Sequence, residues 1–147
     1  MSINFETCSE STKNTNIKIR DPKGGSSTIY FINRDRQQVQ KVDVDCLKLN
    51  GKSCDYLLLV ENHTIEIYIE LKGCRVADAF EQLRNTINII SQDPKKMLKY
   101  CYIVHTRCPP GTDIQREKVK FKKEYRAVLL TRKPNCEESL KQLLIDN

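Results

Sequence analysis

The sequence lacks several features by which whole classes of protein are recognised. No apolar run approaches the roughly 18–20 residues that a membrane-spanning helix needs, so no membrane association is expected. The first thirty residues contain no apolar stretch, and we therefore expect no signal peptide. The glycines at positions 24 and 25 are not followed by the lysine and helix start of a phosphate-binding loop. What remains is a mildly basic chain of 147 residues, the usual size of one domain.

Paired metal ligands of the zinc-site type are also missing. The chain has seven cysteines but no CxxC pair, and its only histidines are His63 and His105. A structural zinc site usually draws four such ligands from short paired spacings, so none is expected here. Without a secretory signal, the cysteines are predicted to be reduced, buried thiols of a cytoplasmic protein.

The positive charge is concentrated in one part of the chain. Lys and Arg number 25 against 19 Asp and Glu, which gives a formal net charge of +6. Residues 1–92 hold 12 basic and 12 acidic side chains, whereas residues 93–147 hold 13 and 7. A local basic surface favours a polyanionic partner, although an ordinary solvated helix face is the alternative. The residues predicted to bind nucleic acid are Arg116, Lys118, Lys120, Lys122 and Lys123.

Hydrophobic periodicity predicts an α/β fold with a mixed β-sheet and flanking helices. Residues 1–27 are polar and predict a loosely ordered arm, and residues 28–147 predict a single domain. Alternating or β-branched runs predict strands at 28–32, 38–49, 55–60, 65–71, 99–104 and 126–131. Predicted helices run from Val76 to Ile90, from a capping box at Thr112, and over 137–145. An antiparallel meander is thus followed by crossover helices and strands.

The hairpin made by residues 55–60 and 65–71 gathers chemistry-bearing side chains at one end. If its turn is centred on Asn62 and His63, Asp55 lies opposite Glu70. Because side chains alternate across a strand, Asp55, Glu70 and Lys72 then share one face. The other face is apolar throughout and consists of Tyr56, Leu58, Val60, Ile65, Ile67, Ile69 and Leu71.

Two carboxylates that face each other at about 4.5–5.5 Å repel, so a cation is expected between them. Mg²⁺ suits this position because it takes one or two carboxylates and keeps waters for a phosphate substrate. Lys72 would position the attacking water or neutralise charge that develops on the phosphate. The alternative is a solvent-exposed sheet face with a Glu70–Lys72 neighbour pair and a functionally unimportant Asp55, since a one-residue slip exchanges the faces.

Asp55, followed on the next strand by Glu70-Leu71-Lys72, resembles the motif of the PD-(D/E)XK nuclease superfamily. Cys54 stands where that motif has proline, and the resemblance covers roughly residues 28–131. It implies a restriction-endonuclease-like core of β-meander, helix and strand. It also implies that Asp55, Glu70 and the carbonyl of Leu71 bind metal, and that Lys72 is the catalytic lysine.

The resemblance to the same family also concerns Gln82 and an acidic residue before the sheet. Some members carry a glutamine on the helix after the motif, and Gln82 lies where that catalytic residue would fall; a solvated helix glutamine is the alternative. Many members carry an acid on a helix before the sheet. Here a strand is predicted instead, so this ligand is either absent or replaced by Asp43 or Asp45.

The expected function is that of a Mg²⁺-dependent endonuclease, with Mn²⁺ as a substitute ion, that hydrolyses phosphodiester bonds. DNA is favoured as the substrate. Since one site cuts one strand, a homodimer or a subunit of a larger defence or repair complex is expected by analogy with the family. The alternative is a catalytically inactive nuclease-like module that binds nucleic acid or protein.

Overall fold

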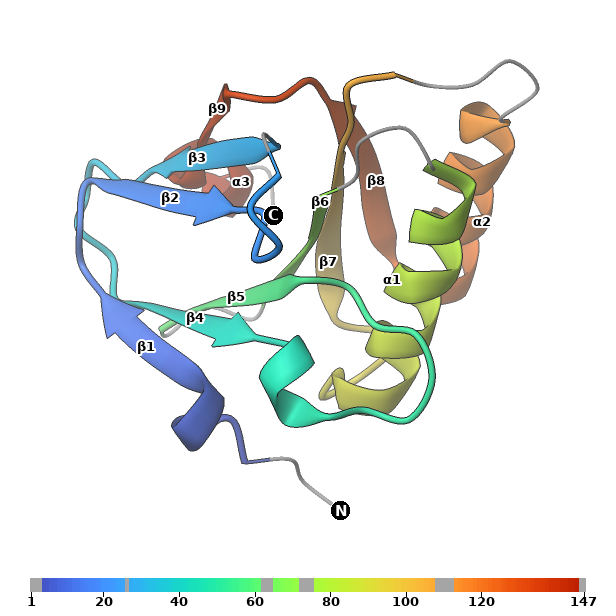
Figure 1. Ribbon diagram of the computed structural model, residues 1–147, viewed down its shortest axis with the longest axis horizontal. Helices are drawn as coiled ribbons and strands as arrows, with labels where there is room; N and C mark the ends of the chain where they lie inside the picture. The colour runs from blue at the N-terminus through green and yellow to red at the C-terminus, as the bar shows by residue number, and fades with distance from the viewer. Residues whose placement is uncertain (1–3, 26, 62–64, 72–75, 108–112, 146–147) are drawn as a thin grey trace.

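The computed structural model describes residues 4–25, 27–61, 65–71, 76–107 and 113–145. The chain forms three layers: a large central sheet, two helices on one of its faces, and a small sheet with a short helix on the other (Figure 1). The predicted mixed α/β class is therefore confirmed. In the described ranges, no helix is long and apolar enough to cross a membrane.

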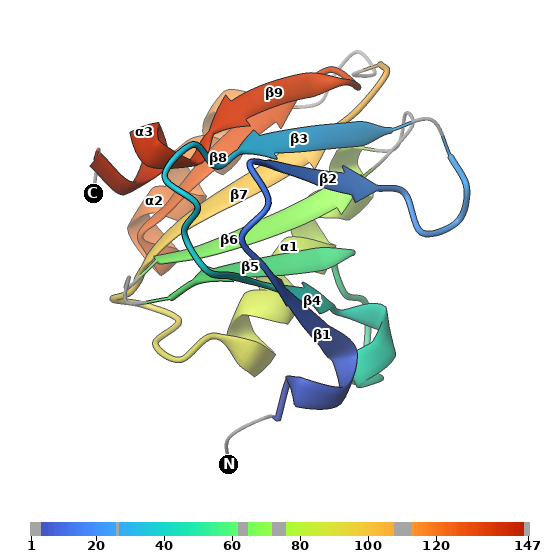
Figure 2. The ribbon, with the colours of Figure 1, turned by 90° about the vertical axis from the view of Figure 1, so that its left-hand side faces the viewer.

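The large sheet has the strand order β1-β4-β5-β6-β7-β8. Its strands are β1 (Ser9–Thr12), β4 (Val39–Asp43), β5 (Tyr56–Val60), β6 (Ile65–Leu71), β7 (Leu98–Val104) and β8 (Ala127–Arg132). From β1 to β6 each pair of neighbours is antiparallel, and β6, β7 and β8 are parallel (Figure 2). Antiparallel pairing thus comes first and parallel crossover strands follow, as the periodicity predicts.

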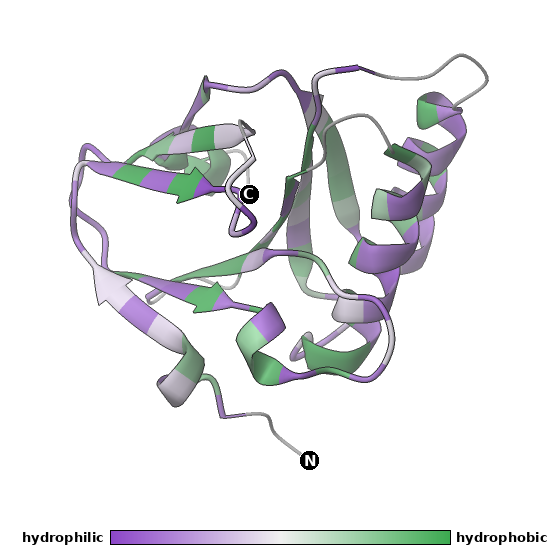
Figure 3. Cartoon of the chain, viewed as in Figure 1, coloured by the Kyte–Doolittle hydropathy of each residue, from purple (hydrophilic) through white to green (hydrophobic). Residues whose placement is uncertain are grey.

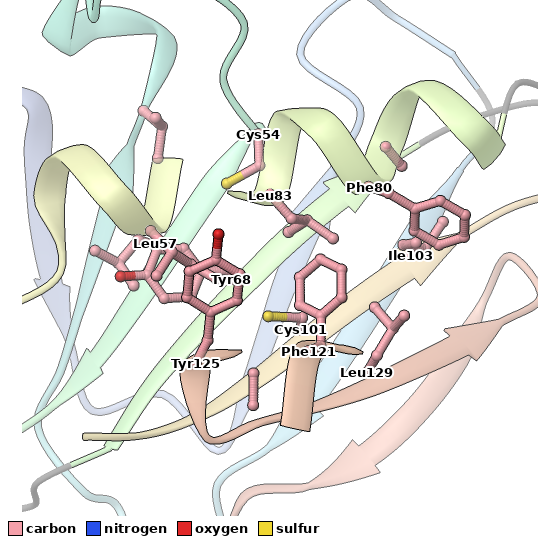
Figure 4. Packing of buried hydrophobic residues seen from close by; sticks show 14 of the residues in the cluster. Cys54, Leu57, Tyr68, Phe80, Leu83, Cys101, Ile103, Phe121, Tyr125 and Leu129 are labelled. Carbon is pink, nitrogen blue, oxygen red and sulfur yellow. The ribbon is translucent and has the colours of Figure 1, made fainter. Parts of the chain in front are cut away.

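Helices α1 (Val76–Ile90) and α2 (Ile114–Tyr125) cover one face of the large sheet. The predicted apolar stripe of α1, which includes Phe80 and Leu83, is buried. Figure 4 shows this stripe meeting Tyr68 and Cys101 of the sheet and Phe121 of α2. The predicted basic helix is confirmed, but its N-cap is Asp113, whose side chain accepts a hydrogen bond from the backbone N–H of Arg116. Thr112 lies outside the described residues.

A small sheet of β2 (Asn16–Arg20), β3 (Thr28–Ile32) and β9 (Cys136–Ser139) packs on the opposite face, together with α3 (Leu140–Ile145). Its inward residues include Ile19 and Phe31, which join Leu58 and Ile67 of the large sheet in a second apolar core. Both faces of the central strands are consequently buried. Figure 3 shows the alternation of apolar and polar residues along β2.

Three predicted elements differ from the observed ones. The expected loose arm contains β1 and β2, because the alternation of Ile17 and Ile19 with polar residues places both isoleucines in the second core. The strand expected over 38–49 ends at Asp43 and is followed by the 3₁₀ turn η2 (Asp45–Leu47). The closing helix begins only at Leu140, since residues 136–139 pair with β3 as a parallel strand.

The prediction that all cysteines are reduced is wrong for two of them. Cys8, at the end of the 3₁₀ turn η1 (Glu6–Cys8), forms a disulfide with Cys46 of η2. Cys54 and Cys101 are free and buried, in agreement with the prediction, and Cys136 is free and half-buried. The bond joins the start of the edge strand β1 to the turn that follows β4. Sequence spacing could not reveal it, because the pairing depends on the proximity of two 3₁₀ turns in the fold.

Reduction of the Cys8–Cys46 disulfide is expected to lower the free energy of unfolding by about 4 kcal/mol. The two residues are separated by 38 positions, and opening a loop of that size restores chain entropy to the unfolded state. Urea unfolding with and without dithiothreitol measures the difference. A Cys8→Ser/Cys46→Ser variant serves as control, because its stability should not respond to the reductant. Equal midpoints for the oxidised and reduced wild type would contradict the expectation.

The buried thiols predict a loss of stability at alkaline pH. Burial raises the pKa of the thiols of Cys54 and Cys101 well above the ordinary value of 9.0. Above that pH the unfolded chain releases protons that the folded chain keeps, so the free energy of unfolding falls as pH rises. Each thiol contributes up to about 1.4 kcal/mol per pH unit.

Urea unfolding between pH 8 and pH 10.5 measures this slope. Cys101→Ala should remove roughly half of the contribution of the two thiols. An identical slope in wild type and variant would show that the thiols do not carry the effect.

Candidate active site

The predicted hairpin register is confirmed. Strands β5 and β6 pair Tyr56 with Ile69, Leu57 with Tyr68, Leu58 with Ile67 and Leu59 with Glu66. The same register places Asp55, the residue before β5, beside Glu70. The backbone N–H of Asp55 donates to the carbonyl of Ile69 at 3.1 Å, which continues the pairing to this point. The two acids therefore lie at the same end of two neighbouring strands.

Both carboxylates of the Asp55–Glu70 pair are shielded from solvent. Asp55 is 9% exposed and Glu70 2% exposed. The Asp55 carboxylate is fixed in place because its Oδ2 accepts a hydrogen bond from the backbone N–H of Leu71 at 2.8 Å. Where two acidic side chains at paired strand positions are buried together, their like charges repel, and a cation between them would relieve that repulsion.

The negative charges of Asp55 and Glu70 affect the pKa of the neighbouring Cys54 thiol. Its pKa is raised first by burial, then by the negative charge of Glu70, and to a smaller degree by that of Asp55. Both carboxylates thus act on the same buried position beside α1. Figure 4 shows Cys54 beside Leu83 of α1, in the same buried cluster.

The alternative of a solvent-exposed acidic face is wrong. The predicted apolar face of the hairpin packs under the small sheet, apart from Tyr56, which is only half-buried. The acidic face is also covered, because Leu57 and Tyr68 pack against α1. Glu70 consequently sits at the edge of a core, not on a wet sheet surface.

Three polar side chains of α1 hold the segment that leads into Asp55. Gln82 donates from Nε2 to the carbonyl of Ser53 at 3.2 Å. Asn85 donates to the carbonyls of Asn50 and Lys52 at 3.0 and 2.6 Å. The hydroxyl of Thr86 accepts from the backbone N–H of Cys54 at 2.9 Å and donates to the carbonyl of Gln82 at 2.7 Å. Helix α1 thereby fixes the position at which β5 begins.

Gln82 is accordingly not a solvated helix glutamine. Its side chain turns toward the segment before Asp55, where its Nε2 donates to the carbonyl of Ser53, and its catalytic role stays a prediction. Its Oε1 is buried, and no described group donates a hydrogen bond to it. An acceptor in that state can receive a hydrogen bond from a water molecule at the site.

The carboxylates of Asp43 and Asp45 do not complete a ligand set. Asp43 accepts from the backbone N–H of Cys46 at 3.4 Å, and the exposed Asp45 accepts from the hydroxyl of Ser53 at 3.4 Å. Their charges raise the pKa of Tyr56, after burial, together with that of Asp55. In the part of the chain that the structure describes, no group of three or more His, Cys, Asp or Glu residues is placed to hold a metal.

Lys72 and Leu71 are the remaining two residues of the predicted site. Lys72 lies outside the described residues, so its position is not part of the site geometry. Leu71 is described and buried, and its N–H binds Asp55. The expected role of its carbonyl as a metal ligand stays a prediction.

Glu66 is a second buried acid on β6 that the sequence did not lead us to expect. The carboxylate of Glu66 accepts hydrogen bonds from the hydroxyl groups of Tyr68 and Ser91 at 3.0 and 2.6 Å, and from the N–H of Gln92 at 3.2 Å. Its strand partner is Lys99, which is also fully buried. A charged pair inside two apolar strands is the signal that could have revealed it.

Lys99 ties three chain segments together. Its Nζ donates to the carbonyls of Asp93 and Tyr125 at 2.9 Å each, and to that of Met97. Burial lowers the pKa of this ammonium group. Because Lys99 and Glu66 have hydrogen-bonding partners within the fold, the network stabilises the end of the sheet opposite Glu70 and is not a second reaction centre.

The predicted nucleic-acid-binding side chains occupy different faces of α2. Arg116, Lys120, Lys122 and Lys123 are exposed, and Lys118 is half-buried. Phe121 and Tyr125 are buried on the sheet side, so they pack within the core and do not form a surface on which bases could stack. Comparison with protein-family models, characterised proteins and solved structures gives no match.

Proposed function

We propose that this chain is a metal-dependent nuclease that hydrolyses phosphodiester bonds in DNA. The observation that carries the proposal is the Asp55–Glu70 pair, two buried acidic residues that the register brings together where β5 begins and β6 ends. The burial of both residues and the hydrogen bond that fixes Asp55 support this proposal, because carboxylate oxygens are the ligands that a divalent cation such as Mg²⁺ prefers.

The residues of the pair fit Mg²⁺, or Mn²⁺ in its place. Mg²⁺ needs only one or two protein carboxylates because waters and substrate phosphates fill its remaining positions. The buried acceptor Oε1 of Gln82 offers a hydrogen-bonding position for such a water. When bound, the ion would act as a Lewis acid toward the phosphate oxygen.

The residues of the chain would hold the ion, orient a water molecule and activate the attacking water. Asp55 and Glu70 would hold the ion, with the carbonyl of Leu71 beside them. Gln82 would orient a water, and α1 would keep the start of β5 in register with β6 through Gln82 and Thr86. By the family resemblance, Lys72 would position or activate the attacking water and stabilise charge on the phosphate.

Assembly and location belong to the same proposal. One site cuts one strand, so a homodimer or a subunit of a defence or repair complex would be needed to break a duplex. A cytoplasmic location is also part of the proposal. The Cys8–Cys46 disulfide does not support it, because disulfides are rare in that compartment.

A plasmid-nicking assay tests the proposal. Supercoiled DNA should be converted to the nicked form in the presence of Mg²⁺ and remain intact with EDTA. No nicking under either condition, with Mn²⁺ also tested and single-stranded DNA and RNA intact as well, would contradict it.

A catalytically inactive binding module is the second candidate. It is favoured by the lack of a third acidic, cysteine or histidine ligand among the described residues. Such a module would bind DNA in a salt-sensitive way with no effect of divalent ions.

A further inference from the structure

A groove lies between the end of α1 and the C-terminal half of α2, away from the carboxylate pair. It encloses about 690 Å³. We call it the lysine groove; it is lined by Asn88 and Lys95, by Val119, Lys120, Lys123 and Tyr125, and by the acidic Glu124. The parallel strands place it far from Glu70, because α1 runs from the end of β6 back toward the start of β7.

We propose that the lysine groove binds the phosphate backbone of the substrate strand at a distance from the cleaved bond. This inference rests on the proposed function. It adds that the protein contacts the substrate strand at phosphates away from the cleaved bond. A lysine binds phosphate through its ammonium group as a point charge, and three lysine residues line this groove. Residues 93–147, which supply these lysines, carry the entire net charge of the chain.

The walls of the groove are held together by hydrogen bonds. Asn88 of α1 donates to the hydroxyl of Tyr125 in α2 at 3.3 Å. Arg126 donates from Nη1 to the carbonyl of Lys96 at 3.0 Å, which joins the end of α2 to the loop that carries Lys95. Lys99 joins the same loop to α2 through Asp93 and Tyr125. A groove fixed in this way binds a ligand with little loss of conformational entropy.

Helix α2 is also anchored on α1 along its length. Arg84 forms an ion pair with Glu117 and lies 4.8 Å from the centre of the Phe121 ring. The pair occupies the Glu117 carboxylate, so this acid is directed into the helix interface. The outward face of α2 keeps its positive character beside it.

A row of cations connects the groove to the other end of α2. Arg116, Lys120 and Lys123 are exposed and recur at spacings of four and three, which places them on one helix face. Seven residues of helix extend for about 10 Å, which corresponds to about three phosphates of one DNA strand. Arg116 lies in the first turn of α2, at the end of the sheet where β6 ends. Lys118 and Lys122 lie on another face and do not line the groove.

Fluorescence anisotropy in EDTA tests the inference without cleavage. The probes are fluorescein-labelled DNA strands of about 20 and about four nucleotides, titrated at several salt concentrations. Lys120→Gln/Lys123→Gln should weaken binding of the long strand at least tenfold, because two phosphate contacts are lost. The slope of log K against log salt should fall by about 1.4, as expected for a single strand. Binding of the short strand should change much less.

Lys133→Gln/Lys141→Gln is the matched control, since it removes the same number of charges at exposed lysines outside the groove and outside α2. Its effect on the long strand should be less than threefold. Equal losses in the two variants would overturn the inference and reduce it to a general effect of net charge. Preferential displacement of the long strand by a poly-glutamate peptide would also overturn it, because an acidic protein would then be the better occupant.

The outcome can be separated from that of the proposed function. Groove-dependent binding without any cleavage in Mg²⁺ would support the groove and contradict the nuclease. Cleavage of the long strand that is unaffected by Lys120→Gln/Lys123→Gln would support the nuclease and contradict the groove.

Discussion

Replacing Glu70 by glutamine is expected to lower the rate of Mg²⁺-dependent DNA cleavage by a factor of about 100 or more. The substitution keeps the size of the side chain and removes one of the two charges that would hold the ion beside Asp55. Loss of a metal ligand costs at least as much as the loss of its hydrogen-bonding partners, which is about 10- to 100-fold. The rate of plasmid nicking measures the effect.

Glu81→Gln provides the matched control for this experiment. Glu81 also lies near the site segment, but it is exposed and forms a surface ion pair with Lys52 at 3.3 Å. The variant should cleave at the rate of the wild type, because an exposed pair of this kind contributes little. Glu70→Gln with the full rate of cleavage and a native circular-dichroism spectrum would show that Glu70 takes no part in the reaction.

Replacing Lys99 by methionine is expected to lower the free energy of unfolding by about 3–5 kcal/mol. The change leaves three carbonyls without this donor, that of Tyr125 in a buried position, and it removes the positive charge beside the buried Glu66. Unfolding in urea measures the loss, with Lys96→Met as a control at an exposed lysine of the loop before β7. A difference below 1 kcal/mol between the two variants would contradict the assigned role of Lys99.

The effect of Lys99 on the pH dependence of stability has the opposite sign to that of the buried thiols. Because burial lowers the pKa of Lys99 in the folded state, the folded chain releases this proton at a lower pH than the unfolded chain does. Stability gained from this group rises with pH within that window, whereas the contribution of Cys54 and Cys101 falls. Two thiols outweigh one ammonium group, so the net change above pH 9 is a loss.

The parts of the fold that could be predicted from sequence are those with strong local periodicity. The hairpin of β5 and β6 follows from its alternating apolar residues, and α1 follows from spacings of three and four. Strand β9 could not be predicted in this way, because Cys136–Ser139 is polar and becomes a strand only by pairing with β3. Strand β2 carried a readable alternation at Ile17 and Ile19 that the polar composition of the first 27 residues concealed.

The candidate site likewise has one part that local sequence patterns predict and another that depends on tertiary contacts. Its acidic pair follows from the register of one hairpin, which depends only on the turn position and the side-chain alternation. The burial of that pair depends on α1, and α1 reaches it through Gln82, Asn85 and Thr86, whose partners lie about 30 residues away. The tie between Cys8 and Cys46 likewise depends on tertiary proximity.

Calorimetric titration of Mn²⁺ tests most directly whether Asp55 and Glu70 form a metal site. The wild type should bind one ion per chain, and Asp55→Asn and Glu70→Gln should each abolish the heat of binding. Asparagine keeps an acceptor for the N–H of Leu71, so a loss of binding in Asp55→Asn would reflect the missing charge and not a disturbed strand. No binding heat in the wild type, or unchanged binding in both variants, would contradict the account.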